Sequence, residues 1–220
     1  NLLDRAFVVM MDPYSGEVLS MVGKQLSTNK ETGKREILDY AYGTFTSAYE
    51  IGSTIKPATL LTGYDQGVID MGETLIDEPI KIGKQGKIKS SIFNRSSRIA
   101  MNDLQAIEQS SNVYMFKVGF RLANAVYQYE QSMRVNYNDF AAFSILRNSY
   151  AQFGLGVRTG IDLPGEVSGV TGTGRLPGNL MDLTIGQYDT YTPLQMAQYV
   201  STIANGGNRV KPHVVKEIRE

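Results

Sequence analysis

Two short polar segments of this sequence combine residues that could carry out nucleophilic chemistry. The first is Ser53-Thr54-Ile55-Lys56, which opens a stretch with a helical pattern. Residues three apart lie on the same face of a helix, so the Lys56 amine could reach the Ser53 hydroxyl. A serine alcohol is a weak nucleophile and needs a base within hydrogen-bond reach. Ser53 is therefore the candidate nucleophile and Lys56 the candidate base.

A lysine acts as a base near neutral pH only if its pKa is lowered. Desolvation lowers the pKa, and so does the positive potential at the N-terminus of a helix. The free N–H groups there could also bind an oxyanion. Pro57 removes one such N–H, which costs least in the first turn, so we place the helix start at or near Ser53. The Ser-x-x-Lys spacing also occurs on solvated helix faces, and by itself it favours that plainer interpretation.

The second segment is Ser110-Ser111-Asn112, which lies between two predicted helices. In a non-helical link, Ser110 and Asn112 can point together into a cleft. The hydroxyl could then pass a proton, and the amide could hold a peptide group of a substrate. The alternative is that Ser110 or Ser111 only caps the second helix. The segment alone leaves both interpretations open.

The elements that would position these segments follow from hydrophobic pattern and turn residues. The first part of the chain predicts a hairpin over 6–23, a surface loop or ragged strand end over 24–39, a helix over 52–67 and irregular structure over 70–98. The remainder predicts helices from 102, over 113–122, from 138–139 to 154 and from 192 to 205, a glycine-rich loop over 165–180 and a strand over 209–218. This order is α+β rather than alternating βαβ. The last strand must pair with the early hairpin or with something outside this chain.

Composition excludes several classes of function. The 220 residues hold 22 Lys and Arg against 22 Asp and Glu, so no basic excess indicates a nucleic-acid partner. The sequence has no cysteine, which excludes disulfides and thiolate catalysis. No His/Asp/Glu cluster has metal-ligand spacing, so no metal or cofactor is predicted. No apolar run approaches the ~18–20 residues of a membrane span.

Four polar residues outside the two segments are interpreted as structural. Asp77 and Glu78 precede a proline and predict a loop or turn. Asp162 precedes Leu-Pro-Gly and is a turn residue on this interpretation. His213 is the only histidine, and nothing near Ser53 requires it, so we expect it at the surface.

With both segments in place, the chain resembles the penicillin-binding proteins. In that family and in class A β-lactamases, Ser-x-x-Lys occurs together with Ser-Asp-Asn and Lys-Thr-Gly. The resemblance includes the flanks of both segments and four further stretches in the family's order, namely 49–59, 109–113, 159–166, 186–187, 192–197 and 204–207. It is strongest to the class B, monofunctional, division-type proteins of Gram-positive bacteria (the penicillin-binding protein 2B or 3 kind).

The resemblance implies a serine β-lactamase-like transpeptidase fold, with an antiparallel sheet and helices on both sides. It implies a D,D-transpeptidase in which Ser53 attacks the D-Ala-D-Ala end of a peptidoglycan stem peptide and Lys56 is the general base. Ser110 would relay protons to the leaving group, and Asn112 would bind the substrate. The backbone N–H of Ser53 would form half of the oxyanion hole. β-Lactams would mimic the donor and remain on Ser53.

The same resemblance implies partners and a location. An amine on a neighbouring stem peptide would accept the acyl group, and divisome proteins would bind the longer protein. The site would lie at the extracytoplasmic cell surface, with a membrane anchor in an N-terminal segment not contained in this chain.

One family feature is missing. The sequence contains no Lys-Thr/Ser-Gly, and the Thr-Gly pairs at 171–174 lack a preceding lysine and come before 186–187, in the wrong order. Residues 1–220 are therefore expected to be a partial transpeptidase domain that is inactive by itself. Two competing functions stay open: a β-lactamase or D,D-carboxypeptidase of the same fold, and a β-lactam-binding sensor or scaffold.

Overall fold

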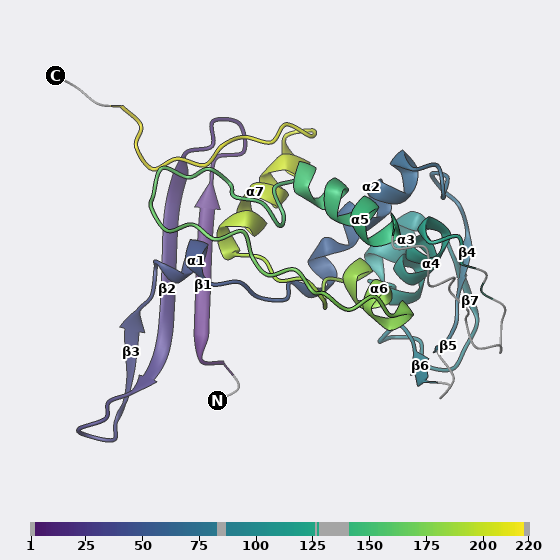
Figure 1. Cartoon of the computed structure of the whole chain (residues 1–220), viewed down its shortest axis with the longest axis horizontal. Helices are drawn as coiled ribbons and strands as arrows, with labels where there is room; N and C mark the ends of the chain where they lie inside the picture. The colour runs from purple at the N-terminus through teal and green to yellow at the C-terminus, as the bar shows by residue number, and fades with distance from the viewer. Residues whose placement is uncertain (1–2, 83–86, 126, 128–140, 218–220) are drawn as a thin grey trace. The chain divides into compact units, whose positions relative to one another are not determined.

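The computed structural model describes residues 3–82, 87–125, 127 and 141–217 (Figure 1). The chain forms two compact units. The first comprises Asn1–Tyr49, Ala151–Val170 and Thr190–Glu220, and the second comprises Glu50–Tyr150 and Thr171–Asp189. The Ser53-x-x-Lys56 segment and the Ser110-Ser111-Asn112 segment both lie in the second unit.

An antiparallel sheet is the frame of the first unit. Its strands, in the order β1-β2-β3, are β1 (Arg5–Met11), β2 (Val18–Thr28) and β3 (Arg35–Asp39). In the turn after β1, the Asp12 carboxylate accepts the N–H of Tyr14 at 2.8 Å and of Ser15 at 2.7 Å. Gly16 completes the turn with a φ of 83°, which favours glycine. The predicted hairpin is confirmed, whereas the predicted loop over 24–39 instead contains the end of β2 and the whole of β3.

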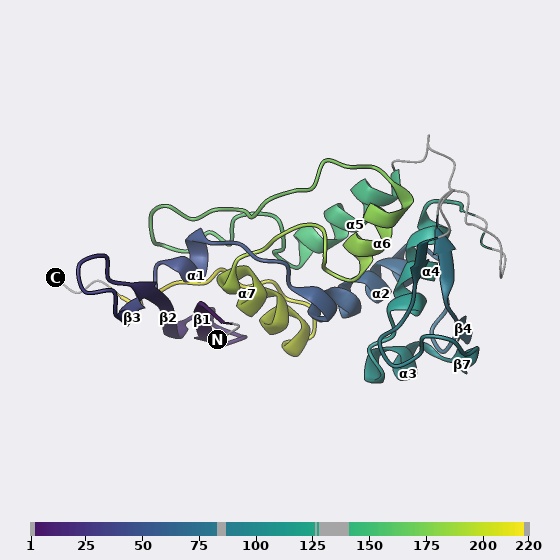
Figure 2. The same cartoon turned by 90° about the horizontal axis from the view of Figure 1, so that it is seen from below.

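Helices α1 (Gly43–Thr46) and α7 (Pro193–Ala204) pack against this sheet (Figures 1 and 2). The buried residues between them are Phe45, Ile161 and Leu194, against which Val9, Val18, Met21 and Leu163 pack. On the other face of the sheet, Val8, Met10 and Val22 are exposed. Within the first unit, α1 and α7 therefore cover one face of this sheet.

Helix α7 begins as its sequence predicts. The Thr192 hydroxyl accepts the N–H of Gln195 at 3.1 Å, and the Gln195 side chain accepts the N–H of Thr192 at 2.8 Å. Pro193 occupies the first turn, where its missing N–H is not needed. The Gln195 amide also donates to the carbonyls of Val157 and Ser168, at 2.6 and 3.1 Å. One capping residue thus fixes the helix start and ties two loops to it.

The predicted strand over 209–218 is wrong for residues 209–217. A single parallel bridge joins His213 to Glu17, with hydrogen bonds on either side of it. The N–H groups of Val214 and Val215 instead donate to the two carboxylate oxygens of Asp162, each at 2.8 Å. A strand partner would need those donors, so Asp162 ends the pairing after one bridge.

The second unit is mainly helical. Its helical elements are the 3₁₀ turn η1 (Gly52–Ile55), α2 (Lys56–Asp65), α3 (Asp103–Glu108), α4 (Asn112–Leu122), most of α5 (Ala141–Gln152) and α6 (Pro177–Thr184). Two antiparallel pairs of short strands accompany them: β4 (Leu75–Asp77) with β7 (Ile99–Met101), and β5 (Ile80–Ile82) with β6 (Lys87–Lys89). The prediction of irregular structure over 70–98 is therefore wrong at three strands of three residues each, which are too short to show a hydrophobic period.

Helix α4 is the centre of this unit, packed against α2 and α6. Two glycines allow the close approach. A Cβ on Gly63 of α2 would lie 2.9 Å from Val118 of α4, and one on Gly119 would lie 2.7 Å from Thr184 of α6. Because α2 carries Lys56 and α4 begins at Asn112, this packing brings the two candidate segments into contact.

The predicted start of α3 and the predicted end of α5 are confirmed. Asn102 caps α3 with a reciprocal bond to Gln105, and Gly154 follows α5 with a φ of 95°. The predicted start of α5 at 138–139 lies outside the described residues. The glycine-rich loop is shorter than predicted, because α6 begins at Pro177.

Candidate active site

Ser53 lies on the 3₁₀ turn η1, ahead of α2. Its side chain is exposed, whereas those of Ile55 and Lys56 are buried. The preceding Gly52 has a φ of 58° and donates its N–H to the carbonyl of Gly186 at 2.9 Å. A Cβ on Gly186 would lie 2.3 Å from the Gly52 oxygen. The close backbone contact between the two glycines therefore anchors the turn that presents Ser53.

Lys56 is 2% exposed and has three hydrogen bonds. Its Nζ lies 2.7 Å from the carbonyl oxygen of Ser110, 2.9 Å from the Ser110 hydroxyl and 2.8 Å from Oδ1 of Asn112. Three acceptors match the three donors of an ammonium. Among the described residues, the Lys56 amine makes no hydrogen bond to Ser53. The spacing predicted that the Lys56 amine could reach the Ser53 hydroxyl, but the hydrogen-bond partners of this amine lie in the Ser110-Ser111-Asn112 segment instead.

Burial lowers the pKa of Lys56 to about 8, and the negative charge of Asp77 opposes this shift. The cause is desolvation, which disfavours the ammonium form. A lysine with such a pKa is partly neutral near physiological pH and can accept a proton, as the sequence analysis required.

Ser110 has a backbone conformation that is unusual for its type. Its φ is 55°, in the left-handed region, where glycine is the usual residue. It follows the end of α3, where its N–H donates to Ile107 at 3.1 Å and the N–H of Ser111 donates to Ala106 at 2.8 Å. This pair of bonds is the standard glycine-type helix end. A serine there adds strain, and the same turn directs its hydroxyl to Lys56.

The two interpretations of Ser110-Ser111-Asn112 are both found, on different residues. Ser111 caps α4, because its hydroxyl accepts the N–H of Tyr114 at 3.0 Å. Ser110 does not cap α4; it contacts Lys56 together with Asn112. Ser110 therefore follows the end of α3, Ser111 caps the start of α4, and Ser110 and Asn112 bind Lys56.

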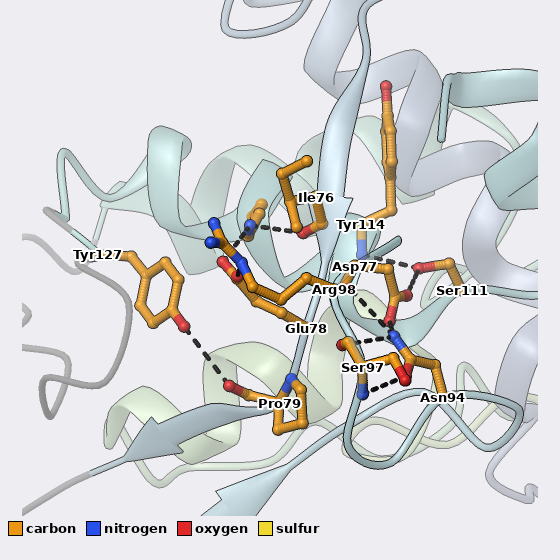
Figure 3. A network of polar contacts seen from close by, with 11 residues as sticks. Ile76, Asp77, Glu78, Pro79, Asn94, Ser97, Arg98, Ser111, Tyr114 and Tyr127 are labelled. Atoms are coloured by element: carbon orange, nitrogen blue, oxygen red, sulfur yellow. Dashed lines mark hydrogen bonds and ion pairs between the residues drawn. The ribbon is translucent and has the colours of Figure 1, made fainter. Parts of the chain in front are cut away.

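Asp77 and Glu78 were predicted to lie in a loop or turn, but both side chains are buried. They are 1% and 3% exposed, and Asp77 ends strand β4 rather than lying in a turn. Figure 3 shows the Asp77 carboxylate with Ser111 and Asn94 turned toward it, and Glu78 beside Arg98. The only sequence signal was an acidic pair next to a short apolar run, which is too common to be specific.

The remaining polar candidates belong to the first unit. Asp162 accepts two backbone N–H groups, which lower its pKa, so its predicted structural role is confirmed. His213 is half-buried and forms the single bridge to Glu17. In the part of the chain that the structure describes, no helix is long and apolar enough to cross a membrane.

The described arrangement can support acyl transfer to a serine. An exposed hydroxyl at the start of a helix is followed, three residues on, by a buried amine of lowered pKa, and this amine is hydrogen-bonded to the hydroxyl of a second serine. Candidates for nucleophile, base and proton relay thus lie in one unit.

The chain belongs to the penicillin-binding protein family: the model of the penicillin binding protein transpeptidase domain matches residues 6–220. It is 51% identical over its whole length to penicillin-binding protein 2A of Bacillus subtilis, of which it covers 30%. The solved structure of penicillin-binding protein 2B from Streptococcus pneumoniae strain R6 superimposes with a TM-score of 0.87 at 35% identity, over 96% of this chain and 33% of that one. Peptidoglycan D,D-transpeptidase MrdA of Acinetobacter baumannii is 26% identical over 96% of this chain and 32% of the relative.

These findings confirm the family, the α+β transpeptidase fold and the likeness to class B proteins of the 2B kind. The chain is homologous to peptidoglycan D,D-transpeptidases. It spans about 30% of the length of the curated relatives that it matches.

Proposed function

We propose that this chain carries the nucleophile, base and proton relay of a peptidoglycan D,D-transpeptidase. The observation that carries the proposal is the buried Lys56 amine, bound to Ser110 and Asn112 and three residues from the exposed Ser53. The two motifs that carried the family resemblance are thus joined through one amine.

In the first half-reaction, the Ser53 Oγ attacks the penultimate carbonyl of a D-Ala-D-Ala stem peptide. Lys56 in its neutral form takes the hydroxyl proton. The tetrahedral intermediate collapses when the bond to the terminal D-alanine breaks, and Ser110 passes a proton to the departing amine. Asn112 holds the substrate's peptide group through its amide.

In the second half-reaction, an amine of a neighbouring stem peptide attacks the acyl-serine. The bond between the acyl carbon and the Ser53 Oγ breaks, the proton of the amine returns through Ser110 and Lys56 to that oxygen, and the product is a cross-link. β-Lactams acylate Ser53 in the same way and remain bound. Because peptidoglycan lies outside the membrane, the proposed site works at the extracytoplasmic surface, in a membrane-anchored protein that binds other divisome proteins.

The 220 residues alone are proposed to be inactive. They contain no Lys-Thr/Ser-Gly segment, which in the family supplies the second oxyanion donor. Loss of one such donor costs about 10²–10³ in rate.

Intact mass after incubation with benzylpenicillin tests the proposal, on the full-length protein and on residues 1–220 side by side. We expect a stable adduct on the full-length protein, none with Ser53→Ala and none on residues 1–220. A folded full-length protein without an adduct contradicts the function. A stoichiometric adduct on residues 1–220 contradicts only the proposed inactivity.

Two further assays, penicillin turnover and activity on a stem-peptide analogue, separate the competing functions. A β-lactamase would hydrolyse penicillin with turnover, and a carboxypeptidase would release D-alanine from a stem-peptide analogue without cross-linking. A sensor or scaffold would form the adduct but leave the analogue unchanged.

A further inference from the structure

Asp77 occupies a position that the proposed mechanism does not use. It is 1% exposed and accepts hydrogen bonds from three side chains: Ser91 at 2.6 Å and Ser111 on Oδ2, and Asn94 at 2.9 Å on Oδ1. Among the described residues, it has no ion-pair partner within 4 Å. A buried carboxylate held only by neutral donors is costly, so its retention calls for a physical explanation.

Ser91 and Ser111 connect the Asp77 carboxylate to the start of α4 through hydrogen bonds. Because a carboxylate can only accept, the hydroxyls of Ser91 and Ser111 must donate to Asp77 and keep their lone pairs for other donors. Ser91 accepts the N–H of Asn112 at 2.9 Å and of Val113 at 3.2 Å. Ser111 accepts the N–H of Tyr114 at 3.0 Å.

The first three N–H groups of α4 are therefore satisfied by hydroxyls that Asp77 orients. A negative charge also interacts favourably with the positive end of a helix. Asn112, the first residue of α4, is one of the ligands of Lys56, and Ser110 is two residues earlier. A rotation of this helix start would move both acceptors away from the amine.

We propose that Asp77 is a positioning residue of this site: through Ser91 and Ser111 it holds the start of α4 so that Ser110 and Asn112 bind the Lys56 amine. The inference rests on the proposed function, because it assigns Asp77 to the same reaction.

The charges around Asp77 come from two helices and from the residue that follows it. Lys56 of α2 and Lys117 of α4 both interact with its charge. Glu78, beside it, is paired with Lys117 at 3.1 Å and with Arg98 at 2.7 Å. Removing the Asp77 charge takes away the negative group that raises the pKa of Lys56, so that pKa should fall below about 8.

The experiment measures the benzylpenicillin acylation rate of the full-length protein against pH. Asp77→Asn should lower the maximal rate by on the order of tenfold, the loss expected when a buried hydrogen-bond network is left unsatisfied. It should also shift the midpoint of the acid limb to lower pH. Glu78→Gln is the matched control, a neighbouring buried carboxylate that does not contact Ser91 or Ser111. It should keep the rate within about twofold and the midpoint unchanged.

Ser91→Ala separates the positioning of α4 from the effect of the Asp77 charge on Lys56. It also replaces Asp77→Asn if that variant does not fold. It removes one of the two linking hydroxyls and keeps the carboxylate, so the rate should fall while the midpoint stays. The inference is overturned if Asp77→Asn or Ser91→Ala acylates at the wild-type rate, or if Glu78→Gln reproduces both effects of Asp77→Asn.

A second readout does not need activity. The titration of Lys56, followed by NMR of ¹³C-labelled lysine, should move to lower pH in Asp77→Asn and not in Glu78→Gln. If the wild type is not acylated but the titration moves, the proposed function fails, and only the electrostatic coupling of Asp77 to Lys56 stands. If Ser53 is acylated and neither the titration nor the rate changes, the role of Asp77 fails alone.

Discussion

The amine of Lys56 lies 2.9 Å from the hydroxyl of Ser110 and 2.7 Å from its carbonyl oxygen, although the two residues are 54 positions apart. This contact joins the Ser-x-x-Lys segment to the Ser-x-Asn segment. It also means that the base of the proposed reaction is already hydrogen-bonded to the proposed proton relay before any substrate binds.

The pKa of Lys56 predicts the pH dependence of acylation. The neutral amine is the base, and burial lowers its pKa to about 8, so the benzylpenicillin acylation rate should rise with pH and level off above about 8. Stopped-flow or quenched mass measurements from pH 6 to 10 on the full-length protein check this.

Lys56→Met is the control, because it is uncharged and of similar length. It should lose the pH-dependent limb together with most of the rate, on the order of 10³-fold, as expected for an essential base that also positions the relay. A wild-type profile that is flat across this range would contradict Lys56 as the titrating base.

The left-handed conformation of Ser110 predicts that two variants lacking its hydroxyl differ in stability but not in activity. Both Ser110→Gly and Ser110→Ala remove the hydroxyl, but only glycine relieves the strain at a φ of 55°. We expect Ser110→Gly to be more stable than Ser110→Ala by about 1 kcal/mol. Both should lose acylation activity to a similar extent.

Urea unfolding of the two variants, compared with their acylation rates, checks this prediction. Equal stabilities would mean that no strain is stored at Ser110. An active Ser110→Ala would remove Ser110 from the proton path.

The contact between Gly186 and Gly52 predicts that a single methyl group disrupts the turn that presents Ser53. In Gly186→Ala, the new Cβ would meet the Gly52 oxygen at 2.3 Å, and the φ of 72° disfavours any other residue. We expect a loss of about 2 kcal/mol or more in unfolding free energy, and a loss of acylation beyond what the unfolded fraction explains.

Gly178→Ala is the matched control for this change. Gly178 lies within α6, and a Cβ there would meet nothing within 4 Å. It should stabilise the protein by about 0.5–1 kcal/mol, because alanine is the better helix former, and leave acylation unchanged. If Gly186→Ala and Gly178→Ala have the same unfolding temperature, the close contact of Gly186 with Gly52 does not exclude a methyl group, and the prediction is wrong.

The bonds of Asp162 to Val214 and Val215 predict that residues 209–217 depend on pH. These bonds lower the pKa of Asp162, so their stabilising effect is present above its unfolded value and is lost as pH falls through the lower folded value. Asp162→Asn should release the segment at every pH.

Amide hydrogen exchange of Val214 and Val215 measures this directly. We expect protection at pH 6 in the wild type and little protection in Asp162→Asn. Protection that persists in the variant would show that the bridge at His213 is sufficient to hold the segment.

Local signals in the sequence predicted the helix ends well. Thr192 with Gln195, and Asn102 with Gln105, form the reciprocal caps that their spacing indicates. Both caps involve atoms within three residues of each other, so no distant part of the chain was needed to predict them.

Non-local pairing was predicted poorly. The strands over 75–101 are three residues long and depend on partners elsewhere in the chain, so no period reveals them. The predicted strand over 209–218 failed for the converse reason. Its apolar pattern is compatible with a strand, but the N–H groups of Val214 and Val215 are taken by Asp162, more than fifty residues earlier.

The sequence by itself selected the candidate residues of the proposed site, because Ser53, Lys56, Ser110 and Asn112 lie in two segments that together resemble the motifs of the penicillin-binding proteins. Tertiary structure decided which of them touch, and it assigned Asp77 to the support of α4. Hydrogen bonds and burial between segments far apart in the chain depend on how helices α2 and α4 pack. Residue spacing within either segment carries no information on that packing, and so neither the partners of the Lys56 amine nor its lowered pKa could be derived from the sequence alone.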